Sequence, residues 1–90
     1  MKIESTHNFI KIYKRRFSNR PNIQSKFDER VRLFAENPQD VLLKDHPLSG
    51  KLQGFRAFSI TGDVRVVYFV NEETAYLVDI GTHNQVYSRY

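Results

Sequence analysis

The sequence contains no cysteine, no apolar run long enough to cross a membrane, and no repeated or low-complexity segment. Without cysteine, the chain can form neither a disulfide nor a thiolate metal site, which fits a reducing cytoplasm. A membrane-spanning helix needs roughly 18 apolar residues, and no apolar signal region follows Met1. We therefore expect a cytoplasmic protein that does not associate with membranes.

Two kinds of functional motif are also missing. The glycines at positions 50, 54 and 62 match no phosphate-binding loop and are typical of turns. His46 and His83 lie far apart in the sequence and have no clustered acidic pair, so no metal-ligand spacing is present. We expect neither a metal nor another cofactor.

Composition supports one folded unit over residues 1–90. Hydrophobic residues make up 40% of the 90 residues and aromatic residues 13%, which is enough for a compact core. A chain of this length leaves little room for a second core. We expect a single domain without a linker.

Positive charge is concentrated in the first part of the chain. Residues 1–36 contain nine Lys/Arg and four Asp/Glu, a balance of +5, whereas residues 37–90 contain five and six, a balance of −1. The basic residues include Lys14, Arg15, Arg16 and Arg20. Such a surface attracts the phosphate backbone of a nucleic acid and would equally attract an acidic protein. The alternative is a solvated helix face that only confers solubility.

Apolar spacing predicts two helices in the first half and three strands in the second. The expected order is β-α-α-β-β-β, an α+β fold in which two helices pack on a mainly antiparallel sheet. The strands are expected at residues 1–5, 55–61, 64–70 and 74–80, and the helices from about residue 6 to Phe17 and from about Asn22 to Glu36. A short tail would add a final edge strand.

Gly62-Asp63 predicts a two-residue type II′ hairpin turn between the strands at 55–61 and 64–70. In that register Ile60 faces Arg65, which places Arg56 and Arg65 at opposite ends of one sheet face. Both faces are largely apolar, so the pattern leaves open which of them the helices cover. Arginines with apolar neighbours need an anionic partner from the protein or from a ligand.

Two histidines at strand margins are candidates for proton transfer, because imidazole gains or loses a proton near pH 7. His46 precedes Pro47, and His83 follows Gly81-Thr82. Either histidine alone is as compatible with a hydrogen-bonding surface residue. Asp63 is similarly compatible with plain turn chemistry. Tyr87 is either an edge aromatic residue or a ring that stacks on a base.

The motifs Lys44–Gly50, Gly54-Phe55-Arg56 and Gly81-Thr82-His83 resemble the RelE/ParE superfamily of bacterial toxins, most closely its YafQ-like mRNA interferase branch. The resemblance spans Lys44 to Tyr87 and implies a RelE-like fold, with two N-terminal helices on a twisted, mainly antiparallel sheet. It implies metal-independent cleavage of messenger RNA in the ribosomal decoding site, with the basic helices in contact with ribosomal RNA. It also implies an antitoxin that wraps around the toxin and silences it.

The resemblance also assigns roles to single residues. Its catalytic positions match His46, Asp63 and His83, and its substrate-binding positions correspond to Arg65, which is similar to a phosphate-contacting arginine, and to Tyr87 at a functional aromatic position. Arg56 is a third candidate for phosphate binding. Ser59 departs from the pattern, because the YafQ-like branch has another active-site histidine there and serine is a far poorer general base.

Cleavage of RNA without a metal needs a base, an acid and positive charge. The base takes the proton of the 2′-hydroxyl, which attacks the adjacent phosphorus, and the acid protonates the departing 5′-oxygen. We expect His46 as base, His83 as acid and Arg65 on the phosphate, although sequence alone allows the two histidines to exchange roles. Two alternatives are a ParE-like poison of DNA gyrase and a degenerate toxin that only binds its antitoxin.

Overall fold

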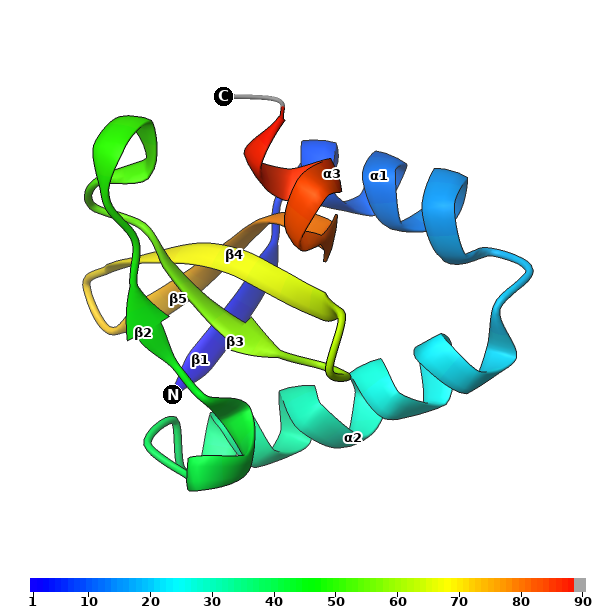
Figure 1. The fold of residues 1–90 in the computed structure, drawn as a ribbon. Helices are drawn as coiled ribbons and strands as arrows, with labels where there is room; N and C mark the ends of the chain where they lie inside the picture. The colour runs from blue at the N-terminus through cyan, green and yellow to red at the C-terminus, as the bar shows by residue number, and fades with distance from the viewer. Residues whose placement is uncertain (89–90) are drawn as a thin grey trace.

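Residues 1–88 are described in the computed structural model of the chain, and they form a five-stranded sheet flanked by three α-helices (Figure 1). The elements in chain order are β1 (Lys2–Ser5), α1 (His7–Phe17), α2 (Pro21–Glu36), the 3-10 turn η1 (Val41–Leu43), β2 (His46–Pro47), the 3-10 turn η2 (Gly50–Leu52), β3 (Arg56–Ser59), β4 (Val64–Asn71), β5 (Thr74–Thr82) and α3 (His83–Tyr87). No helix within these 88 residues is long and apolar enough to span a membrane.

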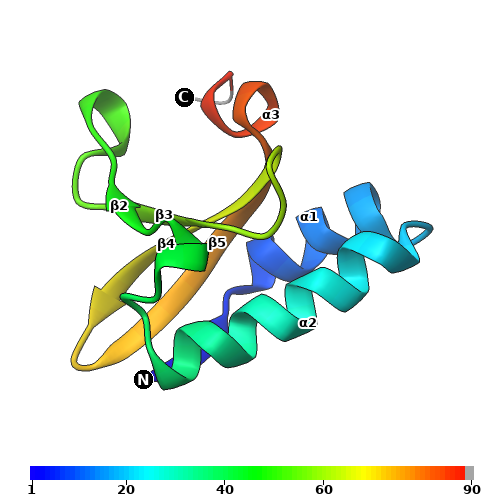
Figure 2. The same ribbon diagram turned by 60° about the horizontal axis from the view of Figure 1, so that its bottom comes forward.

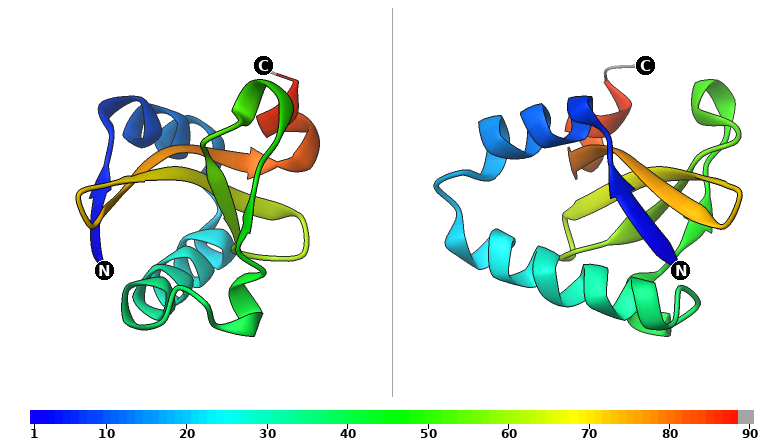
Figure 3. Two further views of the ribbon diagram at one scale, coloured as in Figure 1. Left: turned by 90° about the vertical axis from the view of Figure 1, so that its left-hand side faces the viewer. Right: turned by 180° about the vertical axis from the view of Figure 1, so that it is seen from behind.

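The strand order across the sheet is β1-β5-β4-β3-β2. β1 runs parallel to β5, and the other neighbouring strands are antiparallel. The view from behind in Figure 3 shows β1 beside β5 at one edge of the twisted sheet. The predicted α+β class with a mainly antiparallel sheet is confirmed.

The two long helices begin and end where the sequence predicts. The Thr6 side chain accepts a hydrogen bond from the Phe9 amide and caps α1. Pro21 occupies the first turn of α2, where its missing N–H costs no hydrogen bond. α2 ends before Asn37-Pro38, because the residue before proline disfavours helical geometry.

α1 and α2 cover one face of the sheet and enclose the larger core. Phe34 of α2 stacks on Phe58 of β3 with ring centroids 4.5 Å apart. The buried members of this core are Phe9, Ile12, Phe17, Ile23, Phe34, Leu43, Phe58, Ile60, Val64, Val66, Tyr68, Ala75, Leu77 and Ile80. The buried residues of α1 are Phe9, Ile12 and Phe17. Apolar spacing predicts that Ile10 is buried with Phe9 and Phe17, but Ile10 is 41% exposed.

The predicted hairpin register is wrong by one residue. Ser59, not Ile60, lies opposite Arg65, and Arg56 lies opposite Tyr68. The turn therefore contains three residues, and Gly62 does not adopt the positive φ that a type II′ turn requires. Since a shift of one residue moves a side chain to the other face, Arg56 and Arg65 lie on opposite faces of the sheet.

The second face of the sheet carries α3 and the segment 48–55, which rise on the side opposite α1 and α2 (Figure 2). Leu48, Leu52 and Val86 pack there with Ala57 and Val67 in a smaller apolar cluster. The sequence predicts an edge strand for the tail, but residues 83–87 form a helix. Thr82 and Gln85 exchange side-chain hydrogen bonds with each other's backbone and fix its first turn.

Candidate functional site

His46 lies on the face of the sheet that carries α3. Its Cα atom is paired with that of Ala57, and residues paired across two strands share a face. His46 is exposed, and its Nδ1 atom is 2.9 Å from the Lys44 carbonyl oxygen. A carbonyl only accepts hydrogen bonds, so in the neutral ring Nδ1 carries the proton and Nε2 keeps a free lone pair. In this neutral form the Nε2 atom of His46 can accept a proton.

His83 is held in the complementary form. Its Nδ1 atom is 3.3 Å from Nη1 of Arg65. A guanidinium group only donates, so in the neutral ring Nδ1 is the acceptor and Nε2 carries the proton. His83 is the first residue of α3 and is exposed. The ring thus presents an N–H donor away from Arg65.

Arg65 and Ser59 connect the two histidines. Ser59 is paired with Arg65 across β3 and β4. It lies two residues after Ala57, which is paired with His46, so Ser59 and His46 are diagonal neighbours on one face. Diagonal neighbours of this kind lie about 7–8 Å apart at their Cα atoms. Nε of Arg65 is buried and has no hydrogen-bond partner among the described residues. Arg65 therefore keeps donor capacity for an anion.

Tyr87 extends this group along α3. It follows His83 by one helical turn, and the two ring centroids are 4.4 Å apart at an angle of 41°. The half-buried Tyr87 ring also packs against the smaller apolar cluster. The structure thus brings Arg65, His83 and Tyr87 together, whereas His46 lies on the same face of the sheet but two strands away from Arg65.

Asp63 lies at the margin of this group. It is exposed in the turn between β3 and β4, and its amide donates to Oγ1 of Thr61. It lines a cavity of about 220 Å³ together with Arg16, Arg20 and Thr82, the residue before His83. This position places Asp63 beside the start of α3. Its catalytic role stays a prediction.

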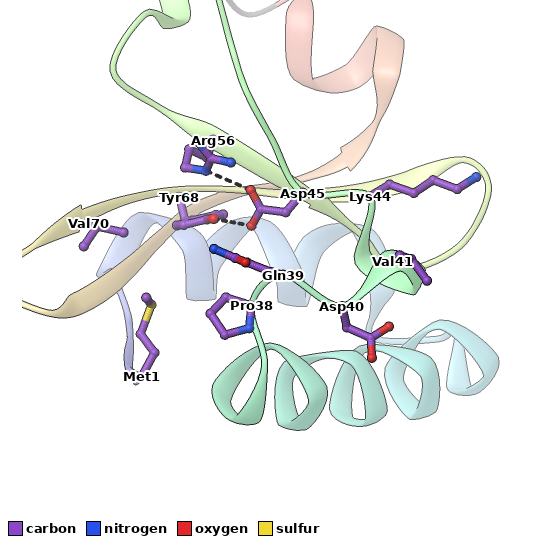
Figure 4. Close-up of a pocket in the computed structure, with 10 residues that line it drawn as sticks. All are labelled: Met1, Pro38, Gln39, Asp40, Val41, Lys44, Asp45, Arg56, Tyr68 and Val70. Carbon is purple, nitrogen blue, oxygen red and sulfur yellow. Dashed lines mark hydrogen bonds and ion pairs between the residues drawn. The ribbon is translucent and has the colours of Figure 1, made fainter.

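Arg56 lies on the other face and is part of a different group. Its Nε atom donates to Oδ1 of Asp45 at 2.8 Å, and the Tyr68 hydroxyl donates to Oδ2 of the same carboxylate (Figure 4). The Asp45 side chain is only 8% exposed. This triad lines a cavity of about 520 Å³ bounded by residues near the end of α2. Substrate binding by Arg56 stays a prediction, whereas its ion pair is a feature of the fold.

The triad fixes the approach to β2, because Asp45 directly precedes His46. Burial raises the pKa of Tyr68 above its ordinary value of 10.0, and the Asp45 carboxylate raises it further. Burial lowers the pKa of Arg56, but the hydrogen bond and charge of Asp45 outweigh burial and raise it on balance. Sequence reasoning did not detect the triad, since Tyr68 faces Asp45 only in the observed register.

Packing explains why position 81 of the Gly81-Thr82-His83 motif is a glycine. A side-chain carbon at this buried position would collide with the Arg16 guanidinium and the Gln85 side chain. Arg16 donates to the Ile80 carbonyl oxygen at 2.6 Å and lies 3.5 Å from the buried Asp79 carboxylate. Gly81 therefore lets α1 hold the end of β5, from which His83 projects. No group of three or more possible metal-ligating side chains occurs within residues 1–88.

The comparison with protein families identifies the chain. The model of YafQ, a bacterial toxin of a type II toxin–antitoxin system, matches residues 1–88. The chain belongs to this family. No curated protein matches it significantly.

Solved structures agree with this assignment. A metal-bound toxin from Helicobacter pylori is 31% identical, with a TM-score of 0.73 and coverage of 96% of this chain and 98% of that chain. A YoeB/ParE toxin from Agrobacterium tumefaciens is 24% identical, with a TM-score of 0.75 and coverage of 92% and 99%. YafQ in the Escherichia coli DinJ-YafQ complex is 22% identical, with a TM-score of 0.69 and coverage of 96% and 97%. The chain therefore has the fold of the RelE superfamily toxins and is a type II toxin.

Proposed function

We propose that this YafQ-family toxin is a metal-independent endoribonuclease of the cytoplasm that cleaves messenger RNA on the ribosome. One observation carries the proposal. The hydrogen bonds of His46 leave a free lone pair on its Nε2 atom, whereas those of His83 leave an N–H group on its Nε2 atom. Both side chains lie on the sheet face that carries Arg65, so an RNA strand lying across this face would meet all three groups.

The chemistry needs His46 as the neutral ring and His83 as the imidazolium, because the N–H of a neutral imidazole is too weak an acid to protonate a leaving oxygen. Nε2 of His46 takes the proton of the 2′-hydroxyl, and the 2′-oxygen attacks the adjacent phosphorus to form a cyclic phosphate. The bond from phosphorus to the 5′-oxygen breaks, and a proton from Nε2 of His83 neutralises the departing oxygen. Arg65 stabilises the extra negative charge on the phosphate oxygens in the transition state.

Arg65 also couples substrate binding to the acid. While Nη1 of Arg65 donates to Nδ1 of His83, a proton on Nδ1 would abolish that bond and place two cations 3.3 Å apart. A phosphate that accepts hydrogen bonds from Arg65 frees Nδ1 to bind a proton. The imidazolium that results is a strong enough acid to release the proton on Nε2. The acid therefore forms when the scissile phosphate is in place.

The remaining residues position the substrate. The Tyr87 ring lies against His83 and offers a surface on which a base can stack. Asp63 assists at the start of α3. Ser59 provides a hydroxyl but no base at the position where the YafQ-like pattern has a histidine, so we expect slower cleavage than with a third imidazole.

A cognate antitoxin is the proposed protein partner. The family to which the chain belongs consists of toxins of type II systems. The structure of the E. coli relative with DinJ supports a protein complex of the same kind for this chain. Binding of an antitoxin over His83 and Tyr87 would block the site.

The test is primer extension on ribosome-bound message after addition of purified wild type or His83→Ala. We expect the substitution to slow cleavage about 10²–10⁴-fold, the usual contribution of an acid–base group. His7→Ala is the matched control, because His7 is an exposed histidine at the start of α1. The His83 assignment is wrong if His83→Ala cleaves as fast as the control.

The same preparations separate the alternative functions. A gyrase poison would leave the message intact and produce gyrase-dependent DNA breaks. A degenerate toxin would do neither and would allow normal growth when expressed without antitoxin. The absence of histidine at position 59 is the observation that favours these alternatives.

A further inference from the structure

A basic cavity lies at the edge of the sheet, next to the candidate site. Its volume is about 400 Å³, and it lies between α2, η1 and the end of β3. Three cationic side chains line it, together with the hydroxyls of two residues: Lys26, Arg30 and Lys44, with Ser59 and Thr61. Among the described residues that line it there is no carboxylate.

The protein neutralises the positive charge of the cavity only in part. Glu29 is the one acidic neighbour within ion-pair distance among the described residues, 3.8 Å from Nζ of Lys26 and 4.0 Å from Nε of Arg30. One carboxylate, 62% exposed, thus serves two positive charges. Nε of Arg30 is buried and has no hydrogen-bond partner in residues 1–88, while its Nη1 atom donates to the Leu42 carbonyl oxygen. The cavity therefore carries an excess of positive charge that an anion can neutralise.

Two links join the cavity to the candidate site. Ser59 lines the cavity and is paired with Arg65. Lys44 lines it as well, and its carbonyl oxygen accepts the Nδ1 proton of His46. Figure 4 shows the Lys44 side chain extending away from the Asp45 carboxylate, so its charge is not used by the triad.

The sheet edge is open between the two regions. Within residues 1–88, β2 pairs with β3 at Ala57 and Arg56, and β3 continues to Ser59 without a partner on that side. A polymer bound at Arg65 can therefore pass over the end of β3 at Ser59 and reach Lys44, Arg30 and Lys26 without crossing β2. Cations along such a path suit a chain with one negative charge per repeat.

We propose that this cavity binds the phosphodiester backbone of RNA beyond the cleavage site. The inference rests on the proposed function in that the partner is RNA, but it does not depend on cleavage. Two sources share this chemistry, which are the message that continues from the site and ribosomal RNA. The favoured reading is RNA rather than an acidic protein segment, because the cavity is continuous with the residues assigned to the scissile phosphate.

The test compares two double variants that remove the same charge. Lys26→Gln/Lys44→Gln removes two cavity cations, and Lys2→Gln/Lys11→Gln removes two exposed cations outside the cavity as the control. Fluorescence anisotropy with non-cleavable 2′-O-methyl RNA measures affinity at several salt concentrations. The plot of log K against log salt is expected to be about 1.4 flatter for the cavity variant, since each phosphate contact on a single strand contributes about 0.7. Thermal unfolding confirms that both variants are folded.

Two arms identify the source of the phosphates. If the message occupies the cavity, the loss appears with a long oligonucleotide and not with one that fills only the cleavage site. If ribosomal RNA occupies it, both oligonucleotides bind normally and cosedimentation with ribosomes weakens. The proposal is overturned if the cavity variant equals the control in both arms, or if only antitoxin binding weakens. Because binding is measured without cleavage, an inactive toxin would leave this result interpretable.

Discussion

The two faces of the sheet use the same kinds of residue for different purposes. On the face covered by α1 and α2, Arg56 is paired with Asp45, and the Tyr68 hydroxyl completes the set. On the face that carries α3, Arg65 is hydrogen-bonded to the His83 ring and has no ion pair with a carboxylate among residues 1–88. A satisfied arginine stabilises the fold, whereas one without an anion is available to a ligand.

The largest effect is expected on the face that carries α3. His46→Ala should slow cleavage about 10²–10⁴-fold, because the general base is lost. Stability should not change, since His46 is exposed and its one side-chain hydrogen bond within the described chain goes to Lys44, two residues away. Primer extension and thermal unfolding measure the two properties. If His46→Ala also lowered the unfolding temperature, the slower cleavage would be explained by a structural role of His46.

The next effect should appear on the opposite face. Asp45→Ala should lower the free energy of unfolding by about 2 kcal/mol, because the buried Tyr68 hydroxyl loses its acceptor and Arg56 loses its ion-pair partner. The partly exposed Arg56 side chain regains water, which limits the loss. Urea denaturation measures the change, with Glu4→Ala on the exposed strand β1 as control. A cost no larger than that of the control would contradict a structural role for the triad.

A smaller effect, an increase in the rate of cleavage, is expected from Ser59→His. The new imidazole would lie between His46 and Arg65, on the face that carries α3. We expect cleavage to become about 10-fold faster, within the range for an added acid–base group. Ser59→Ala controls for loss of the hydroxyl and should change the rate little. Slower cleavage by the histidine variant in a folded protein would show that position 59 does not face the substrate.

The smallest effect concerns alkaline stability. The pKa of Tyr68 is raised in the folded state, so the neutral phenol is favoured by folding. Its contribution is complete below the ordinary pKa of 10.0 and is lost as pH rises above that value. Between about pH 10 and pH 11, the wild type should lose about 1 kcal/mol more than Tyr68→Phe. Burial and Asp28 also raise the pKa of Tyr13. Tyr13 is present in both proteins, so its contribution to the difference cancels. Parallel pH profiles would contradict the prediction.

Much of the fold follows from local signals in the sequence. Thr6, Pro21 and Pro38 mark the helix boundaries, and the change from helical to alternating spacing marks the sheet. The hairpin register does not follow, because both faces of β3 and β4 are largely apolar. Either of two registers that differ by one residue therefore agrees with the alternation of apolar and polar residues. That shift separates Arg56 from Arg65 and brings Tyr68 to Asp45.

The candidate site could be predicted in part. Motif resemblance identified His46 and His83, and the structure shows why position 81 is glycine. The tail was expected to add an edge strand, whereas the reciprocal hydrogen bonds of Thr82 and Gln85 start a helix there. The basic cavity could not be seen in the sequence, since Lys26, Lys44 and Ser59 meet only through tertiary packing.

The division of the two faces is tested most directly by measuring cleavage and stability for Arg65→Gln and Arg56→Gln together. Arg65→Gln should slow cleavage of ribosome-bound message at least about 10²-fold, the scale of one lost transition-state contact, with little change in the unfolding temperature. Arg56→Gln should lower the unfolding temperature and leave cleavage by the folded protein near the wild-type rate. If Arg56→Gln slows cleavage as much as Arg65→Gln without loss of stability, both arginines bind substrate and the division is wrong.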